Sequence, residues 1–182
     1  MYRKCTTEIS VQHQKQVEDA LLQLLQKMPF EEISVTELCR LSGVSRRVFY
    51  HLFSSKLGAL HGLIDHRILG MGSYRPEEDD QTLRFFSYWK DQKELLDGLW
   101  RSNLTGLLIE RLIVTVLNED YDIQYWLRAN GWRQEKDILI YHITGIMGLI
   151  LSWYYGGYQK SPQQMAMLMN ELLFRPMVNP GI

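Results

Sequence analysis

Cysteine is scarce in this chain. Cys5 and Cys39 are the only two among 182 residues, and they form no CxxC pair. A disulfide framework or a structural zinc site needs more thiols at closer spacing, so the sequence argues against both. The first twelve residues, MYRKCTTEISVQ, contain no apolar run of the kind that marks a secretory signal. This predicts a cytoplasmic protein.

The chain also lacks the motifs of common catalytic sites. Neither GxxxxGK[ST] nor GxSxG occurs, and Gly70-Met71-Gly72 has no third glycine and no preceding strand signal. The acidic run at residues 77–80 has no nearby histidine, so it fits a solvated linker better than a metal site. We therefore expect no catalytic residue, no metal and no cofactor, and a protein that is not an enzyme.

Long charge-free runs are rare as well, and one of them raises the question of a membrane. Residues 138–158 contain no Lys, Arg, Asp or Glu, and a bilayer-spanning helix takes about 20 apolar residues. His142, Thr144, Ser152 and several glycines dilute the apolar character of this run. A helix that is apolar all round can also lie in a protein core or an oligomer interface. We favour that interpretation and expect no membrane partner.

Charge of one sign is present locally, although the net charge of the whole chain is only -1. Residues 40–67 contain a single carboxylate, Asp65, against five cationic side chains: Arg40, Arg46, Arg47, Lys56 and Arg67. A local basic patch, and not the total charge, is the electrostatic signature of a nucleic-acid binder.

Helical periodicity recurs throughout and strand signals are weak, which predicts an all-α protein. Ser34, with Glu37 three residues later, predicts a capping box at the start of a helix that Gly43 ends. Ser45 is expected to cap the next helix after a very short turn. Two short helices joined by a tight turn containing glycine, after a longer helix, indicate a helix-turn-helix.

The second of these short helices has one cationic face. Arg46, Arg47, Tyr50 and His51 are spaced so that their side chains share a face, while Val44, Phe49 and Phe53 fall mostly on the other. The two arginines lie in the first turn, where the helix dipole is unfavourable to cations. Their presence there favours a functional partner, and bidentate arginine–guanine contact is the commonest specific contact with DNA bases.

The rest of the chain predicts further helices. A helix that Ser54 or Ser55 caps is expected to end near Leu69, where Gly70 and Gly72 follow. Beyond it the pattern predicts helices over about 83–100 (two helices), 104–117, 118–132 and 138–156, and a last one over 162–174 that Ser161 caps. This makes about nine helices in two parts: a DNA-binding domain over 1–72, which contains the three-helix helix-turn-helix unit, and an α-helical effector and dimerisation domain over 73–182.

Residues 17–63 resemble the DNA-binding domain of the TetR/AcrR family of bacterial transcriptional regulators. The segments "ISVTELCRLSGVS" and "FYHLFSSK" and the apolar row of the first helix carry this resemblance. The remainder is similar to regulators of dihydroxyacetone-kinase operons, through "FFSYW", "LLIERLI" and "GIMGLILSWYYGGYQKSPQQMAMLMNELL". The resemblance implies a homodimer that inserts its third helix into the major groove of a palindromic double-stranded DNA operator. The positions that it places against DNA are Thr36, Arg46, Arg47, Val48, Tyr50 and, on a phosphate, Lys56. The cationic face of the helix adds His51 as an expected contact.

The chain departs from the family pattern on the recognition helix. Family members often have a small residue and then Thr where this chain has Arg47 and Val48, and they usually have His where it has Leu52. These departures remove two polar phosphate contacts, while Arg47 restores a charge. The operator sequence of a relative is therefore not transferable to this chain.

The second part is rich in aromatic residues, which have two interpretations. They form the core and a dimer contact, or they line a pocket between helices for a mostly neutral, apolar effector. The residues expected to touch such an effector are Trp89, Trp100, His142 and Trp153. The two interpretations remain open at the level of the sequence.

Small residues repeat along the expected helix at 138–156. Gly145, Gly148 and Ser152 form a stripe that allows another helix to approach closely, which fits a dimer seam. The following helix adds apolar residues at helical spacing that exceed what one partner helix covers: Met165, Leu168, Met169 and Leu172. These features predict a dimer, and with the family resemblance they imply a homodimeric regulator, a repressor that an effector releases. The alternatives are a regulator whose second part binds a protein, and a DNA-bound adaptor of a non-transcriptional process.

Overall fold

The computed structural model describes residues 2, 7–73, 80–117 and 136–174. Within these ranges the chain forms nine α-helices and no strand, apart from an isolated bridge between Tyr2 and Phe53. The all-α fold class is confirmed. The expected helix over 118–132 lies outside the described residues. The elements are α1 (Glu8–Leu25), the 3-10 turn η1 (Phe30–Glu32), α2 (Val35–Ser42), α3 (Arg46–Leu52), α4 (Lys56–Ser73), α5 (Gln81–Asp91), α6 (Lys93–Arg101), α7 (Thr105–Leu117), α9 (Lys136–Tyr155) and α10 (Pro162–Phe174).

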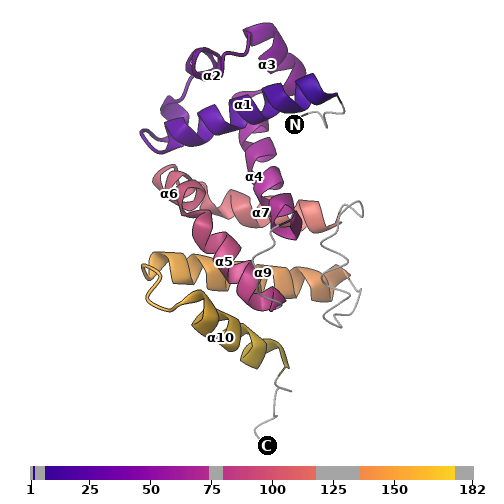
Figure 1. The fold of residues 1–182 in the computed structure, drawn as a ribbon, viewed down its shortest axis with the longest axis vertical. Helices are drawn as coiled ribbons and strands as arrows, with labels where there is room; N and C mark the ends of the chain where they lie inside the picture. The colour runs from indigo at the N-terminus through magenta and orange to yellow at the C-terminus, as the bar shows by residue number, and fades with distance from the viewer. Residues whose placement is uncertain (1, 3–6, 74–79, 118–135, 175–182) are drawn as a thin grey trace, which may run out of the picture.

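The elements are arranged along one long direction. Figure 1 shows α1, α2 and α3 together at one end of the molecule and α10 toward the other, with α4 leading from the first group into the rest. Helix α4 packs against both α1 and α7, and α10 packs against α5. The expected division between residues 72 and 73 falls at the end of α4. This helix therefore supports the helix-turn-helix and also borders the second part.

Local capping signals define the helix-turn-helix as the sequence predicts. The Ser34 hydroxyl accepts from the Glu37 backbone N–H (3.1 Å), and the Glu37 carboxylate accepts from the Ser34 backbone N–H (3.1 Å). Gly43 ends α2 in the left-handed conformation at φ 71°, a conformation that costs a side-chain-bearing residue energy. Ser45 then caps α3 by accepting from the Val48 backbone N–H. The turn between α2 and α3 is short because Gly43 ends the first helix and Ser45 caps the second.

Helix α4 is longer than its glycines predict. Ser55 caps its start by accepting from the Gly58 backbone N–H (3.0 Å), and the helix continues past Gly70 to Ser73. The expected end near Leu69 is therefore wrong. A Cβ atom at Gly70 would come within 2.9 Å of the Tyr88 hydroxyl oxygen. The glycine is present for the close approach of α5, and the helix pays a small propensity cost for it.

Helices α1 and α6 fasten the helix-turn-helix to the second part. A Cβ atom at Gly98 would come within 2.8 Å of the Leu25 side chain, so only a glycine allows α6 to lie this close. The Phe30 backbone N–H donates to the Ser102 hydroxyl (2.9 Å) across the same contact. Arg101 donates to the Leu25 carbonyl. Each bond satisfies a backbone group near the end of α1 or in η1, where helical partners are missing.

A buried ion pair joins α4 to α7. Asp65 is 4% exposed and accepts two bonds from the Arg111 guanidinium, at 2.8 and 2.6 Å. The hydrogen bond to Asp65 raises the pKa of Arg111. Removing one partner of such a pair leaves a buried charge alone, so the pair holds the two helices in one register.

None of the helices in the described ranges has the length and apolar character that crossing a membrane requires.

Candidate nucleic-acid interface

Helix α3 presents its cationic side chains to solvent. Arg46, Arg47, Tyr50 and His51 are exposed, whereas Phe49 and Leu52 are buried at 0% and 3% exposure. Four of the residues predicted from the sequence to face DNA therefore share one exposed surface. We call these four residues the α3 face.

The α3 face reaches back to α2. The Arg46 guanidinium donates to the Thr36 hydroxyl (3.2 Å), so two residues predicted to contact DNA lie next to each other. Thr36 is also exposed, near the start of α2. This bond holds the first-turn arginine in one orientation, which lowers the entropy that an extended side chain loses on binding.

Aromatic contact supports Tyr50 from behind. Its ring lies edge-on to Phe49, with 5.4 Å between the centroids, while 48% of Tyr50 remains exposed. Val48 is partly buried and packs against the hydrophobic core. Val48 is therefore less available for a partner than its neighbours on α3.

The family resemblance implies that the Lys56 ammonium contacts a DNA phosphate, but the structure places it elsewhere. Its ammonium donates to the backbone carbonyls of Phe30 (2.6 Å) and Ile33 (2.7 Å). A third bond goes to the carbonyl of Glu31 (3.1 Å), and the ammonium stands 4.5 Å from the centre of the Phe30 ring. An ammonium has three protons, and these carbonyls use all of them. The lysine ties η1 to the start of α4, so we do not retain it as a phosphate contact.

The four residues expected to touch an effector do not share one surface. Trp89 on α5 is 1% exposed, while Trp100 at the end of α6 is 59% exposed and lies 4.8 Å from the Tyr155 ring. Trp153 is 5% exposed, and its ring nitrogen donates to the Lys160 carbonyl (2.9 Å). His142 is partly buried on α9 beside the Tyr141 ring. A hollow of about 220 Å³ between α9 and α10 borders Trp153 but none of the other three.

The residues expected at a dimer seam fall into two groups. Gly145, Gly148 and Ser152 are exposed, and a Cβ atom at either glycine would meet nothing within 4 Å. Leu172 is 60% exposed, and Leu168 is partly buried. These residues lie on the outside of α9 and α10.

Met165 and Met169 form the second group. They are 3% and 2% exposed, on the side of α10 that packs in this chain's own core, where α10 meets α5. Met165 and Met169 follow the same helical repeat as Leu172, but they lie on the inward face of α10. The expectation that they form a dimer seam is therefore wrong, because a core side chain is not available to a second copy.

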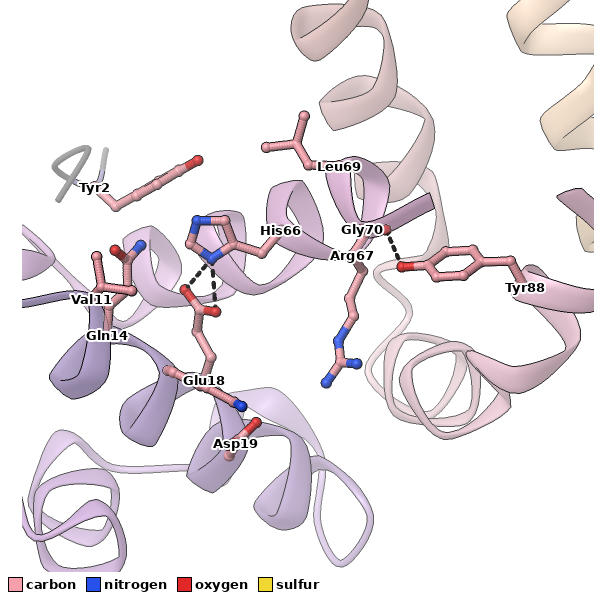
Figure 2. A pocket seen from close by; sticks show the side chains of 11 residues that line it. Tyr2, Val11, Gln14, Glu18, Asp19, His66, Arg67, Leu69, Gly70 and Tyr88 are labelled. Carbon is pink, nitrogen blue, oxygen red and sulfur yellow. Dashed lines mark hydrogen bonds and ion pairs between the residues drawn. The ribbon is translucent and has the colours of Figure 1, made fainter. Parts of the chain in front are cut away.

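A polar cluster on α1 was not among the site residues predicted from the sequence. Gln14 and Glu18 are 3% and 6% exposed, in register with Val17 and Leu21 on the buried side of the helix. The Glu18 carboxylate contacts the His66 ring nitrogen Nδ1 at 2.8 Å, and this hydrogen bond raises the pKa of His66. Figure 2 shows this pair with the residues around it. The sequence signal for this cluster is that Gln14 and Glu18 follow the helical spacing of the apolar residues of α1.

Comparison with known proteins supports the fold. No family model and no curated protein matches the chain. Among solved structures, the chain is similar to the "Crystal structure of tetR-family transcriptional regulator from Streptomyces coelicolor", with a TM-score of 0.56 and 19% sequence identity. The match covers 87% of this chain and 79% of that chain. At this level of identity the likeness shows a shared fold, which includes both the helix-turn-helix and the second helical part.

Proposed function

We propose that this chain is a DNA-binding transcriptional regulator whose helix α3 enters the major groove. The observation that carries the proposal is the α3 face, which is exposed and cationic on a helix with a buried opposite side. A recognition helix of this kind contacts base edges with residues of its first turns. Arg46 and Arg47 supply the bidentate donors, and Tyr50 and His51 reach the flanking backbone. The likeness of the fold to a TetR-family regulator supports the same conclusion.

The regulator acts as a homodimer on a palindromic operator. The exposed side of α9, with Gly145, Gly148 and Ser152, lets a second helix come close, and Leu172 adds apolar surface on α10. Two copies that pair through these helices carry two α3 faces. A two-fold protein then matches a two-fold DNA site, with half-sites about one helical turn or a related longer spacing apart.

The regulation is repression that an effector relieves. Helix α4 follows α3 directly and contacts α7, so a change in the second part moves the support of the recognition helix. A small change in separation of two α3 faces is enough to lose the match to fixed half-sites. The resemblance of the remainder of the chain to regulators of dihydroxyacetone-kinase operons belongs to this proposal.

A second candidate is a regulator whose second part binds a protein. Trp100 and Tyr155 favour it, because they form an exposed aromatic pair with 59% and 48% exposure. Exposed tryptophan and tyrosine are typical anchors of protein interfaces. In this version the partner, and not a small molecule, changes the position of α4.

The proposal is tested by selecting sequences from a random DNA pool with the full chain. We expect enrichment of a palindromic site, and binding that weakens linearly with the logarithm of salt concentration as phosphate contacts release counterions. Placing the selected site over a promoter then tests repression. Recovery of no enriched sequence, with binding no better than to random DNA, would overturn the proposal.

A further inference from the structure

The guanidinium of Arg46 is tied to Thr36 of the neighbouring helix. Its Nη1 donates to the Thr36 hydroxyl oxygen at 3.2 Å, although the two residues are 10 positions apart in the chain. Thr36 is the second residue of α2, and Arg46 is the first residue of α3. The Ser34 capping box fixes the backbone at the start of α2, and the Ser45 cap fixes it at the start of α3. The bond therefore joins two side chains whose backbones are already held in place.

The bond to Thr36 leaves one edge of the Arg46 guanidinium open. Arginine has five N–H donors, and Nε and Nη2 carry two parallel ones on the same edge. Arg46 makes no hydrogen bond from this edge to any of the residues that the structure describes. The same edge of Arg111 holds both carboxylate oxygens of Asp65, with Nε at 2.8 Å and Nη2 at 2.6 Å. Guanine O6 and N7 form a comparable pair of acceptors in the major groove.

The Thr36 hydroxyl has an unused donor. A threonine hydroxyl carries one O–H donor and can accept at the same oxygen atom. It accepts from Arg46, and it donates to none of the described residues. Thr36 is exposed, like Arg46, so a phosphate of the DNA backbone can accept this proton. Phosphate contacts fix the position of a protein on the duplex, whereas base contacts read the sequence. One hydroxyl group is therefore placed to connect a positioning contact with the base contact of Arg46.

Arg47 provides a comparison at the adjacent position. It is also exposed, but it forms no hydrogen bond or ion pair with any residue in the described ranges. A free arginine side chain loses rotamer freedom when it binds, and one that is already held loses less. A free guanidinium also reaches acceptors in several directions, including phosphates, whereas a held one meets only what stands opposite its open edge. The two arginines therefore differ in how strictly they select a partner.

We propose that Thr36 is a positioning residue that makes Arg46 specific for guanine. The inference rests on the proposed function, since it requires α3 in the major groove. Nη1 of Arg46 stays on the Thr36 hydroxyl, and Nε and Nη2 donate to O6 and N7 of one guanine in each half-site. The Thr36 O–H donates to a phosphate beside that guanine. Thr36 thus acts on the discrimination between bases more than on the total affinity for DNA.

The bond itself is tested without DNA. In the free full chain, NMR relaxation of the arginine Nε–H groups measures how strongly each side chain is held. We expect a higher order parameter for Arg46 than for Arg47, and a fall to the Arg47 level in Thr36→Val. Valine has the shape of threonine without the hydroxyl. Thr36→Ser, which keeps the hydroxyl, should retain the wild-type value. Equal order parameters for the two arginines in the wild type would overturn the inference.

The effect on base reading is tested with the selected DNA site. Each base pair of a half-site is replaced in turn, and fluorescence anisotropy gives the loss of affinity at each position. The position that Arg46 reads is the one where Arg46→Ala abolishes discrimination. We expect a guanine there, with a wild-type preference of about tenfold or more over the other bases. Thr36→Val should reduce this preference by about threefold to tenfold, and Thr36→Ser should keep it.

Two comparisons show whether Thr36 acts through Arg46. In the Arg46→Ala background, adding Thr36→Val should change discrimination at that position by less than about twofold, because the side chain to be held is gone. Any position at which Arg47→Ala removes discrimination should keep its wild-type preference in Thr36→Val. An equal loss of preference at every position would mean that Thr36 contacts the backbone without orienting Arg46, which contradicts the inference.

These outcomes separate the inference from the proposed function. If Arg46→Ala lowers discrimination at one position and Thr36→Val does not, the inference is overturned while the proposed function stands. A base other than guanine at that position would also overturn it. If the chain selects no DNA sequence, the proposed function fails and the inference fails with it. A loss in Thr36→Val at the Arg46 position alone, which is absent in Thr36→Ser, supports the inference.

Discussion

The outward sides of α3 and α9 are both exposed, yet they differ in chemistry. The α3 face carries Arg46 and Arg47 on a helix of seven residues. The outward side of α9 carries Gly145, Gly148 and Ser152 on a helix of twenty residues with a single first-turn acidic residue, Asp137. The first surface can attract an anionic polymer at a distance. The second can attract nothing at a distance, but it allows a close fit.

This difference predicts two distinct responses to perturbation. Binding through the α3 face depends on charge and weakens as salt screens it. Binding through α9 depends on volume, because small residues let two backbones approach and a larger side chain keeps them apart. A higher salt concentration should therefore weaken DNA binding much more than dimerisation.

The largest effect should come from enlarging the α9 surface. Gly148→Leu should weaken dimerisation by about 2–6 kcal/mol, since each of the two copies adds an overpacking cost of about 1–3 kcal/mol. Within the chain itself the added side chain meets nothing, so the fold should remain intact. Sedimentation equilibrium measures the change. The matched control is Gly106→Leu on α7, another exposed glycine with open space at its Cβ. A dimer that survives Gly148→Leu would remove Gly148 from the interface.

The next effect concerns the charge of the α3 face. Arg46→Ala and Arg47→Ala should each reduce affinity for the selected DNA site by about 1–3 kcal/mol if they read bases. Lys90→Ala removes an equal charge from an exposed position on α5 and should have little effect. Fluorescence anisotropy with labelled DNA measures all three. Equal losses in all three variants would mean that total charge, and not the α3 face, governs binding.

Lys56 offers a sharper test, because it is a cation near the α3 face that the fold already uses. Lys56→Met should lower the free energy of unfolding by about 1–2 kcal/mol, since it leaves carbonyls of η1 without donors. The salt dependence of DNA binding by the folded variant should stay the same. Urea denaturation and anisotropy titrations at several salt concentrations measure the two quantities. A flatter salt dependence, without loss of stability, would return Lys56 to the DNA surface.

The smallest effect should come from the Glu18–His66 pair, which joins α1 to α4 and belongs to neither surface. The hydrogen bond that His66 donates to the Glu18 carboxylate raises the pKa of His66, whereas burial lowers it. A raised histidine pKa means that the pair stabilises the fold fully below the ordinary value of about 6.5, and that this stability is lost as pH rises through the raised value. The contribution should be below about 1 kcal/mol, because the His66 side chain is 42% exposed and solvent screens it.

The measurement is the difference in unfolding free energy between the wild type and His66→Gln at several pH values. This difference should be largest at low pH and shrink as the pH rises. His61, whose pKa is lowered mainly by burial, contributes with the opposite sign but is common to both proteins and cancels. A difference that grows with pH would contradict the assignment.

Several elements could be predicted because their causes lie close together in the chain. The capping box of Ser34 and Glu37, the left-handed Gly43 and the Ser45 cap all involve residues at most four positions apart. The same holds at α10, where the Gln164 side chain accepts from the Ser161 backbone N–H (2.8 Å) and the Ser161 hydroxyl accepts from the Gln164 backbone N–H (3.2 Å). The exposed side of α3 follows from these caps, since they determine which residues share a helical face.

Other features depend on which segments meet, and no local pattern specifies that. Lys56 looks like a free cation in the sequence, but the carbonyls that hold it are 23 to 26 residues away. From its sequence Gly70 is expected to follow the end of a helix, but it lies within α4, where Tyr88 of α5 packs against it. Met165 and Leu172 share a helical period, yet α5 covers one and leaves the other exposed. A short segment can form a helical turn and its cap alone, because the contacts that stabilise them lie within a few residues. The partners of a lysine, a glycine or a methionine are set by the packing of helices that lie far apart in the sequence.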